Sequence, residues 1–112
     1  MAGNSGGQDK PVFELYYSFA PQDEALCLEL EKHLKPLERQ HLVKCWHRGK
    51  VPVGTNVDQE IKSHKQSANG ILLLLSPDYV ASDDCYAEMQ WALKRKQANG
   101  LLVVPIILRP VE

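Results

Sequence analysis

Hydrophobic residues along the chain form four short runs, separated by stretches in which apolar and polar positions alternate with helical spacing. The runs read FELYYSF at 13–19, LVKCWH at 42–47, NGILLLLSP at 69–77 and LLVVPIIL at 101–108. Their aliphatic and aromatic content predicts β-strands. The five consecutive aliphatic residues at 71–75 indicate a strand that is buried on both faces, as in a parallel sheet.

The segments between the runs predict helices. The first begins at Pro21, and its leucines recur at helical spacing until Pro36, which is expected to kink or end it. Thr55 and Asp58 are expected to form the capping pair of the second helix. Ser82 is expected to cap the third, which starts with acidic residues and ends with basic ones, as the helix dipole favours.

Strands and helices therefore alternate as βαβαβαβ, which predicts an α/β fold, an open parallel sheet with helices on both faces and right-handed crossovers. Pro105 lacks an N–H donor, so the fourth strand is expected at a sheet edge. Ligands of such sheets bind beyond the carboxyl ends of the strands. This rule selects the segments 18–22, 46–54 and 76–85, together with Arg109.

Length and composition indicate one domain. We expect residues 1–10, rich in Gly, Ser, Asn and Gln, to be a flexible leader, and residues 11–112 to fold. A net charge of −1 gives no general attraction to nucleic acid or to a membrane surface. Three widely separated cysteines, with no signal peptide and no membrane-spanning run, favour reduced thiols and a cytoplasmic location.

Several kinds of site are disfavoured by the motifs. The loops contain no GxGxxG or Walker sequence, and the four histidines show no metal-ligand spacing, so no metal is expected. Cys85 lies near a helix start, but no histidine is placed by sequence to act as its base, so packing is its expected role. Glu88 borders the apolar side of the same helix, and its spacing alone favours a solvated or structural role over catalysis.

Four segments together resemble a Toll/interleukin-1 receptor (TIR) domain of the bacterial type. They are LYYSFAPQDE at 15–24, WHRGKVPVG at 46–54, SANGILLLLSPDYVASDDCYAEM at 67–89 and VVPIILRP at 103–110. The resemblance covers nearly everything from residue 12 onward. It implies a flavodoxin-like fold with strand order 2-1-3-4-5, of which this chain is expected to be truncated after the fourth strand.

Many TIR domains hydrolyse NAD⁺, and their catalytic glutamate follows a cysteine in a pattern like SxxCxxE. Ser82, Cys85 and Glu88 fit this pattern, so the resemblance implies that Glu88 is catalytic in cleaving the nicotinamide–ribose bond. NAD⁺ would be the substrate, with no further cofactor, and either ADP-ribose or a cyclic form would be the product. The substrate-binding residues implied in the same way are Ser18, Phe19, Ala20, Trp46, Ser82 and Cys85.

The resemblance also implies self-association through the loop 48–54, contacts with other TIR domains, and a role in immune or cell-death signalling. Two positions in this loop depart from the family pattern. Arg48 stands where an acidic residue is usual, and Pro52 lies two residues before Gly54 rather than one.

The sequence is also compatible with two other functional interpretations. The altered loop and the missing last strand favour a TIR domain that acts only as an adaptor, binding other TIR domains without catalysis. A phosphoacceptor receiver domain has a similar fold, and Asp78 follows the third strand as its phosphoacceptor would. Receiver chemistry, however, needs acidic residues directly at the end of the first strand to bind Mg²⁺, and residues 18–21 intervene before Asp23.

Overall fold

The computed structural model describes residues 12–110, and the expected leader at residues 1–10 lies outside this range. The strands are β1 (Phe13–Ser18), β2 (Val43–Trp46), β3 (Gly70–Leu75) and β4 (Leu102–Ile107). The helices are α1 (Glu24–Arg39), α2 (Val57–Ser67), α3 (Pro77–Ala81) and α4 (Asp83–Asn99). Two short 3₁₀ helices, η2 (Pro21–Asp23) and η3 (Arg48–Lys50), follow β1 and β2.

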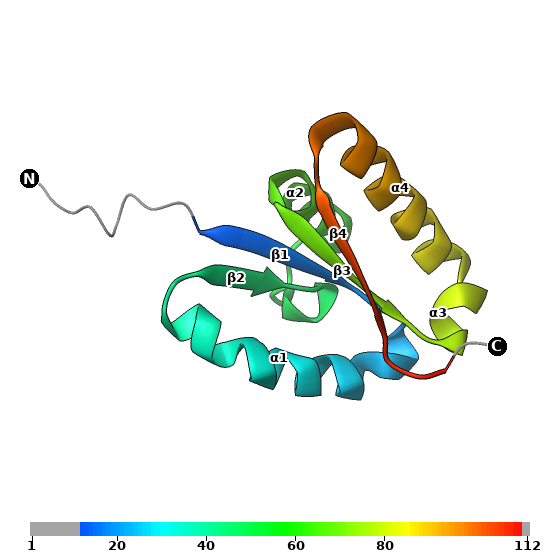
Figure 1. Ribbon diagram of the computed structural model, residues 1–112, viewed down its shortest axis with the longest axis horizontal. Coiled ribbons are helices and arrows are strands. Elements are labelled where there is room, and N and C mark those ends of the chain that lie inside the picture. The colour runs from blue at the N-terminus through cyan, green and yellow to red at the C-terminus, as the bar shows by residue number, and fades with distance from the viewer. Residues whose placement is uncertain (1–11, 111–112) are drawn as a thin grey trace, which may run out of the picture.

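The four strands form one parallel sheet in the order β2-β1-β3-β4 (Figure 1). The predicted flavodoxin-like fold is therefore confirmed. Within the described residues β4 is an edge strand, and Pro105 lies in it opposite Leu73, as the missing N–H donor predicts.

Helices cover both faces of the sheet (Figure 1). On one face α2, α3 and α4 pack over a core that contains Ile71 and Leu73 of β3. On the other face α1 packs over a core that contains Leu72 and Leu74. Successive side chains of a strand point to opposite faces, so β3 needs aliphatic residues at every position, and its unbroken run is explained.

Two local predictions need correction: the helix does not end at Pro36, and the cap of α2 is a different residue. Helix α1 continues through Pro36 to Arg39. The ring removes only the donor to the carbonyl of Lys32, and both residues are exposed, so water can satisfy that carbonyl. The cap of α2 is Asn56, whose Oδ1 accepts from the Gln59 N–H at 3.0 Å, whereas the Thr55 hydroxyl donates to the Pro52 carbonyl at 2.7 Å.

A buried carboxylate joins three segments at the carboxyl edge of the sheet. Asp23 accepts a hydrogen bond from the Ser76 hydroxyl, and its Oδ1 accepts from Arg109 Nε at 2.9 Å. The same guanidinium binds Asp78. Arg109 thus bridges the two carboxylates that a receiver domain would use on either side of Mg²⁺, and this arrangement does not favour receiver chemistry.

The Ser76 hydroxyl has two partners, because it also accepts from the Tyr79 N–H at 3.1 Å as the cap of α3. We therefore expect Ser76→Ala to lower the free energy of unfolding by about 2–4 kcal/mol, through the lost cap and the lost bond to a buried carboxylate. Urea denaturation followed by circular dichroism measures it. The control Ser67→Ala, at an exposed hydroxyl, should change stability by less than about 0.5 kcal/mol, and an equal effect of both changes would contradict the assignment.

Candidate functional site

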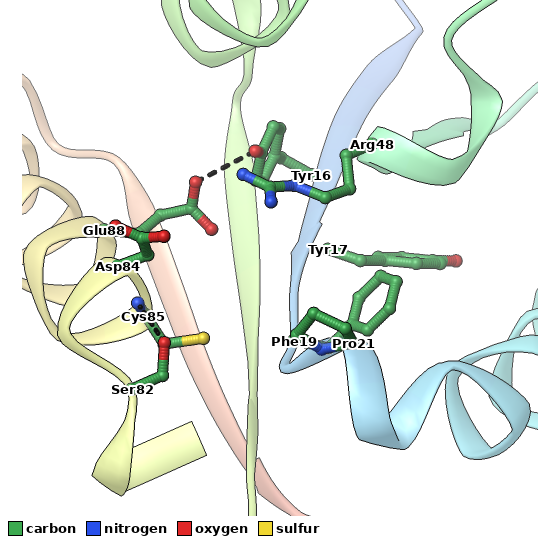
Figure 2. Close-up of a pocket in the computed structure, with 9 residues that line it drawn as sticks. All are labelled: Tyr16, Tyr17, Phe19, Pro21, Arg48, Ser82, Asp84, Cys85 and Glu88. Atoms are coloured by element: carbon green, nitrogen blue, oxygen red, sulfur yellow. Dashed lines mark hydrogen bonds between the residues drawn. The ribbon is translucent and has the colours of Figure 1, made fainter. Parts of the chain in front are cut away.

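A cavity of about 110 Å³ lies between the end of β1, the start of α4 and η3 (Figure 2). This position, beyond the carboxyl end of a parallel strand, is the one that the fold favours for ligands. Its walls are formed by Tyr16, Tyr17, Phe19, Pro21, Arg48, Ser82, Asp84, Cys85 and Glu88.

Glu88 is held in the cavity wall by side chains of β1. The Tyr16 hydroxyl donates to Glu88 Oε2 at 3.0 Å, and the Ser18 hydroxyl donates a short hydrogen bond to Oε1. The Ser18 oxygen lies 2.9 Å from the Tyr79 hydroxyl, which extends the network into the core. Each carboxylate oxygen therefore has a buried hydroxyl partner, and the orientation of Glu88 is fixed by the sheet.

One cation also reaches this carboxylate. Lys65 Nζ, from α2, lies 3.0 Å from Glu88 Oε2. A second cation, Arg48 of η3, lines the cavity opposite α4 (Figure 2). Glu88 is thus paired with Lys65, which lies outside the cavity lining, while Asp84, Glu88 and Arg48 line the cavity itself. Charges of both signs in one cavity can attract both a cationic and an anionic part of one ligand.

The structure brings most of the sequence-predicted residues together. Phe19, Ser82 and Cys85 line the cavity with Glu88. Ser18 lies outside the cavity lining and donates a hydrogen bond to Glu88. Ala20 is fully buried in the core. Trp46, at the end of β2, does not line the cavity. Its ring stacks on His64 at 4.1 Å between centroids and lies 5.5 Å from the ring of Tyr16.

The start of α4 presents Glu88 to the cavity because Ser82 ends the preceding turn. The Ser82 hydroxyl accepts from the Cys85 N–H at 3.2 Å and caps the helix, as predicted. Burial raises the pKa of the Cys85 thiol, although the hydrogen bond from Ser82 opposes this shift. A buried thiol with a raised pKa is a poor nucleophile, which agrees with the expected packing role.

Sequence reasoning missed two polar partners of Glu88, Tyr16 and Lys65, and also Tyr79, whose hydroxyl contacts Ser18. Tyr16 belongs to a hydrophobic strand run, so its hydroxyl carried no separate signal. Burial, followed by the charge of Glu88, raises the pKa of Tyr16 far above its usual value, so the hydroxyl remains a donor. Lys65 comes from a different helix, and only the packing of α2 beside α4 makes the contact.

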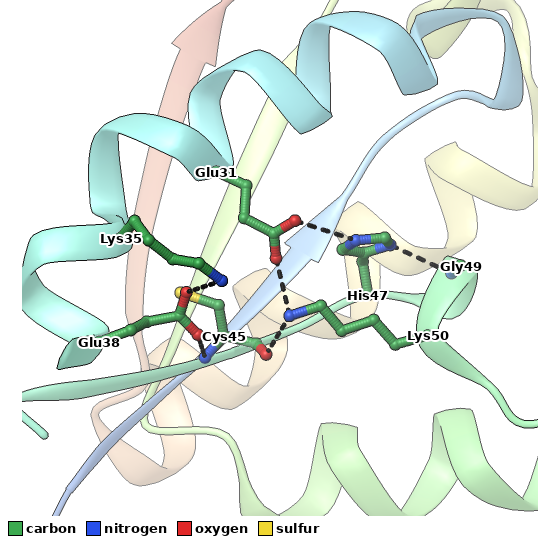
Figure 3. Close-up of polar contacts among 7 residues, drawn as sticks. All are labelled: Glu31, Lys35, Glu38, Cys45, His47, Gly49 and Lys50. Carbon is green, nitrogen blue, oxygen red and sulfur yellow. Dashed lines mark hydrogen bonds and ion pairs between the residues drawn. The ribbon is translucent and has the colours of Figure 1, made fainter.

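The loop 48–54 is anchored to α1 by charged side chains (Figure 3). Glu31 of α1 lies 2.7 Å from Lys50 Nζ, which also donates to the Cys45 carbonyl at 3.0 Å. His47 is buried, its Nδ1 accepts from the Gly49 N–H at 3.1 Å, and its Nε2 lies 3.8 Å from Glu31. These contacts fix the start of the loop and therefore the backbone of Arg48.

The parallel sheet in the order β2-β1-β3-β4, with helices on both faces, defines the flavodoxin-like class of α/β domains. Within this class, the sequence profile of the TIR domain family matches residues 16–112. The chain therefore belongs to the TIR domain family, as its motifs predicted.

The chain also resembles a curated protein of a bacterium. The chain is 40% identical over 96 residues to the uncharacterized protein y4lF of Sinorhizobium fredii (strain NBRC 101917 / NGR234), a match that covers 85% of this chain and 30% of that protein. The chain thus spans less than a third of the length of this curated relative. None of the helices in the described part of the chain is long and apolar enough to cross a membrane.

Two solved structures share the fold. The TIR domain of the Toll-related receptor TRR-2 from Hydra magnipapillata superimposes with a TM-score of 0.69 at 20% identity, covering 88% of this chain and 72% of that one. The TIR domains of the activated Roq1 resistosome, which recognises the pathogen effector XopQ, give a TM-score of 0.65 at 19% identity, covering 85% and 57%. At such low identity these matches establish the fold alone.

The buried His47 in the anchor of the loop should make the stability of the protein depend on pH. Burial lowers the pKa of His47 below its ordinary value of 6.5, with Lys50 acting in the same direction and the nearby Glu31 and Glu24 opposing it. Below about pH 6.5 the unfolded chain binds a proton that the folded chain resists. Stability should therefore fall as the pH drops from 6.5 toward the folded pKa, by up to about 1.4 kcal/mol per pH unit.

His47→Asn isolates this contribution, because its amide oxygen can still accept from Gly49 but cannot titrate. Urea denaturation between pH 7.5 and 5.5 should show a shallower loss of stability for this variant than for the wild type. Parallel pH profiles of the two proteins would contradict the assignment.

Proposed function

We propose that this TIR domain cleaves the nicotinamide–ribose bond of NAD⁺ and that Glu88 is its catalytic carboxylate. The observation that carries the proposal is the fixed position of Glu88 in the cavity wall, with one hydroxyl of β1 on each of its oxygens. Ser82 and Cys85, which complete the SxxCxxE pattern, lie in the same wall.

The chemistry of this bond needs only one carboxylate. As the bond from the ribose anomeric carbon to nitrogen breaks, its electron pair leaves with nicotinamide, which departs neutral and needs no general acid. The positive charge moves to the ribose ring, and a preorganised carboxylate stabilises that charge. Water then adds to the anomeric carbon and releases a proton, giving ADP-ribose. Two-carboxylate glycosidases differ because their leaving group must be protonated.

The dimensions of the cavity suit part of NAD⁺. A volume of about 110 Å³ is smaller than the roughly 300–1,000 Å³ of sites that enclose drug-sized ligands. It would hold the nicotinamide riboside end, while the rest of the dinucleotide extends outward. Arg48, on the cavity wall, supplies a positive charge where the pyrophosphate would pass. The arginine that replaces the usual acidic residue would thus help to bind the substrate.

Glu88→Gln tests this proposal, because it keeps the size of the side chain and removes its charge. We expect nicotinamide release from NAD⁺ to fall at least about 100-fold, the size of effect that follows the loss of one electrostatic stabiliser of a transition state. Chromatography of the reaction products of concentrated protein measures it. Glu29→Gln, at an exposed carboxylate on α1 paired with Lys32, is the matched control and should keep wild-type activity.

Two results would remove the proposal. One is wild-type nicotinamide release by Glu88→Gln. The other is the lack of any product from the wild-type protein under conditions in which it self-associates.

Self-association through the loop 48–54 is the second part of the proposal. Val53 at its tip is completely exposed, and Gly54 takes a φ of +90° that favours glycine. An exposed aliphatic side chain on a tight turn suits a contact with a second copy of the domain. The Roq1 TIR domains, which share this fold, act within a resistosome.

Val53→Asp should weaken self-association by about tenfold or more, because an aspartate would be desolvated in the contact. Analytical ultracentrifugation over a range of concentrations measures the dimer dissociation constant. The control is Leu28→Asp, which places the same charge on an exposed position of α1. An unchanged dissociation constant in Val53→Asp would show that the loop tip is not in the interface.

An adaptor that binds other TIR domains without catalysis is the second candidate function. The ion pair with Lys65 favours it, since this pair neutralises Glu88 in the free protein. Specific binding to a second TIR domain by both wild type and Glu88→Gln, with no nicotinamide released by either, would support the adaptor.

A further inference from the structure

We propose that Lys65 determines the specificity of the cavity: its ammonium neutralises Glu88 in the free protein, and a ligand replaces it only by bringing a cation of its own. This inference rests on the proposed function, in which that cation is the pyridinium of NAD⁺. The sequence motifs did not single out Lys65, since it lies on α2, away from the SxxCxxE segment.

The contact of Lys65 with Glu88 is close and shielded from solvent. Lys65 Nζ lies 3.0 Å from Glu88 Oε2, and the two side chains are 22% and 12% exposed. The Tyr16 hydroxyl donates to the same oxygen at 3.0 Å. In this partly buried setting the charges are screened much less than at the surface, so the lysine cancels most of the attraction that Glu88 would exert on another cation.

The orientation of Glu88 does not depend on Lys65. Tyr16 and Ser18 are both almost completely buried on β1, and each donates to one oxygen of the carboxylate. Ser18 is held in turn by the Tyr79 hydroxyl. These hydroxyls are uncharged and rigidly placed, so removal of the ammonium leaves the carboxylate in position and changes only its charge balance.

Lys65 also has a second partner close to the first. Its ammonium lies 5.1 Å from the centre of the Trp91 ring on α4, and such a ring attracts a cation. Its backbone is fixed separately, because Arg95 Nη1 donates to the Lys65 carbonyl. The ammonium therefore contacts Glu88 and Trp91 at the same time, and the Arg95 guanidinium lies 5.5 Å from the centre of the same ring. The flexible stem of the lysine can release the ammonium from Glu88 while α2 stays in place.

Lys65 therefore selects ligands by their charge, and we call this effect a charge filter. A neutral ligand offers Glu88 no replacement for the ammonium and leaves the ion pair intact. A pyridinium riboside supplies the positive charge itself, so Lys65 can leave Glu88 without leaving the carboxylate uncompensated. With the ammonium displaced, Glu88 keeps its negative charge for the ribose cation that forms as nicotinamide leaves.

The test compares two ligands that differ in charge and little in shape: nicotinamide riboside, which is a cation, and its neutral dihydro form. Calorimetric titration of the full chain gives both dissociation constants. Lys65→Met removes the charge and keeps the stem, so we expect the cation to bind about tenfold more tightly and the neutral form to bind as before. Lys65→Arg keeps the charge and should behave like the wild type. Lys62→Met, an exposed lysine on the same helix, is the control and should bind both ligands as the wild type does.

A second pair of variants tests whether the effect passes through Glu88. In a Glu88→Gln background, Lys65→Met should tighten binding of the cation by clearly less, because only the direct repulsion between the ammonium and the ligand remains. Lys65→Gln provides a second neutral side chain if Lys65→Met lowers the thermal midpoint. A gain of the same size without the Glu88 charge, a gain for both ligands, or an unchanged or lost affinity for the cation in both neutral variants would overturn the proposal.

Kinetics separate this role from that of a positioning residue. With NAD⁺ as substrate, Lys65→Met should lower KM without lowering kcat, whereas a fall in kcat at constant KM would mark Lys65 as a positioning residue and overturn the charge filter. The proposed function fails differently. If Glu88→Gln cleaves NAD⁺ as the wild type does, the enzymatic proposal is wrong, while the two riboside titrations still decide the role of Lys65.

Discussion

The buried carboxylate of Asp23 is the constraint on which the carboxyl edge of the sheet depends. A charge in this position is costly unless it is paired, and its partners Ser76 and Arg109 come from the segments that follow β3 and β4. Three chain segments are thereby tied to one point. The end of β1 and the start of α3 are fixed relative to each other, and the cavity is built against this fixed edge.

The cavity shows how a hydrophobic strand can also carry polar chemistry. β1 supplies core packing through most of its length, yet Tyr16 and Ser18 direct their hydroxyls to Glu88 on α4. The opposite wall contains Arg48, which follows β2. The ion pair between Lys50 and Glu31 attaches this segment to α1. A rigid carboxylate on α4 thus shares the cavity with a cation from the loop that follows β2.

Most of the fold was predictable because it follows from local periodicity. The unbroken aliphatic run of β3, the edge position of Pro105 and the Ser82 cap were all correctly predicted. The predictions that failed concerned the ends of helices. Asn56 caps α2 in place of Thr55, and Pro36 is accommodated within the exposed last turn of α1, where solvent can satisfy the carbonyl that the proline leaves free.

The sequence by itself determined the alternation of strands and helices, the family, and the position of Glu88 near the start of its helix, because these depend on spacing along the chain. Only the tertiary structure decided what surrounds Glu88. Tyr16, Ser18 and Lys65 reach the carboxylate from two other elements, and contacts of such long separation leave no periodic signal. The charge environment of the site, and with it the chemistry that the site can perform, is therefore a property of packing.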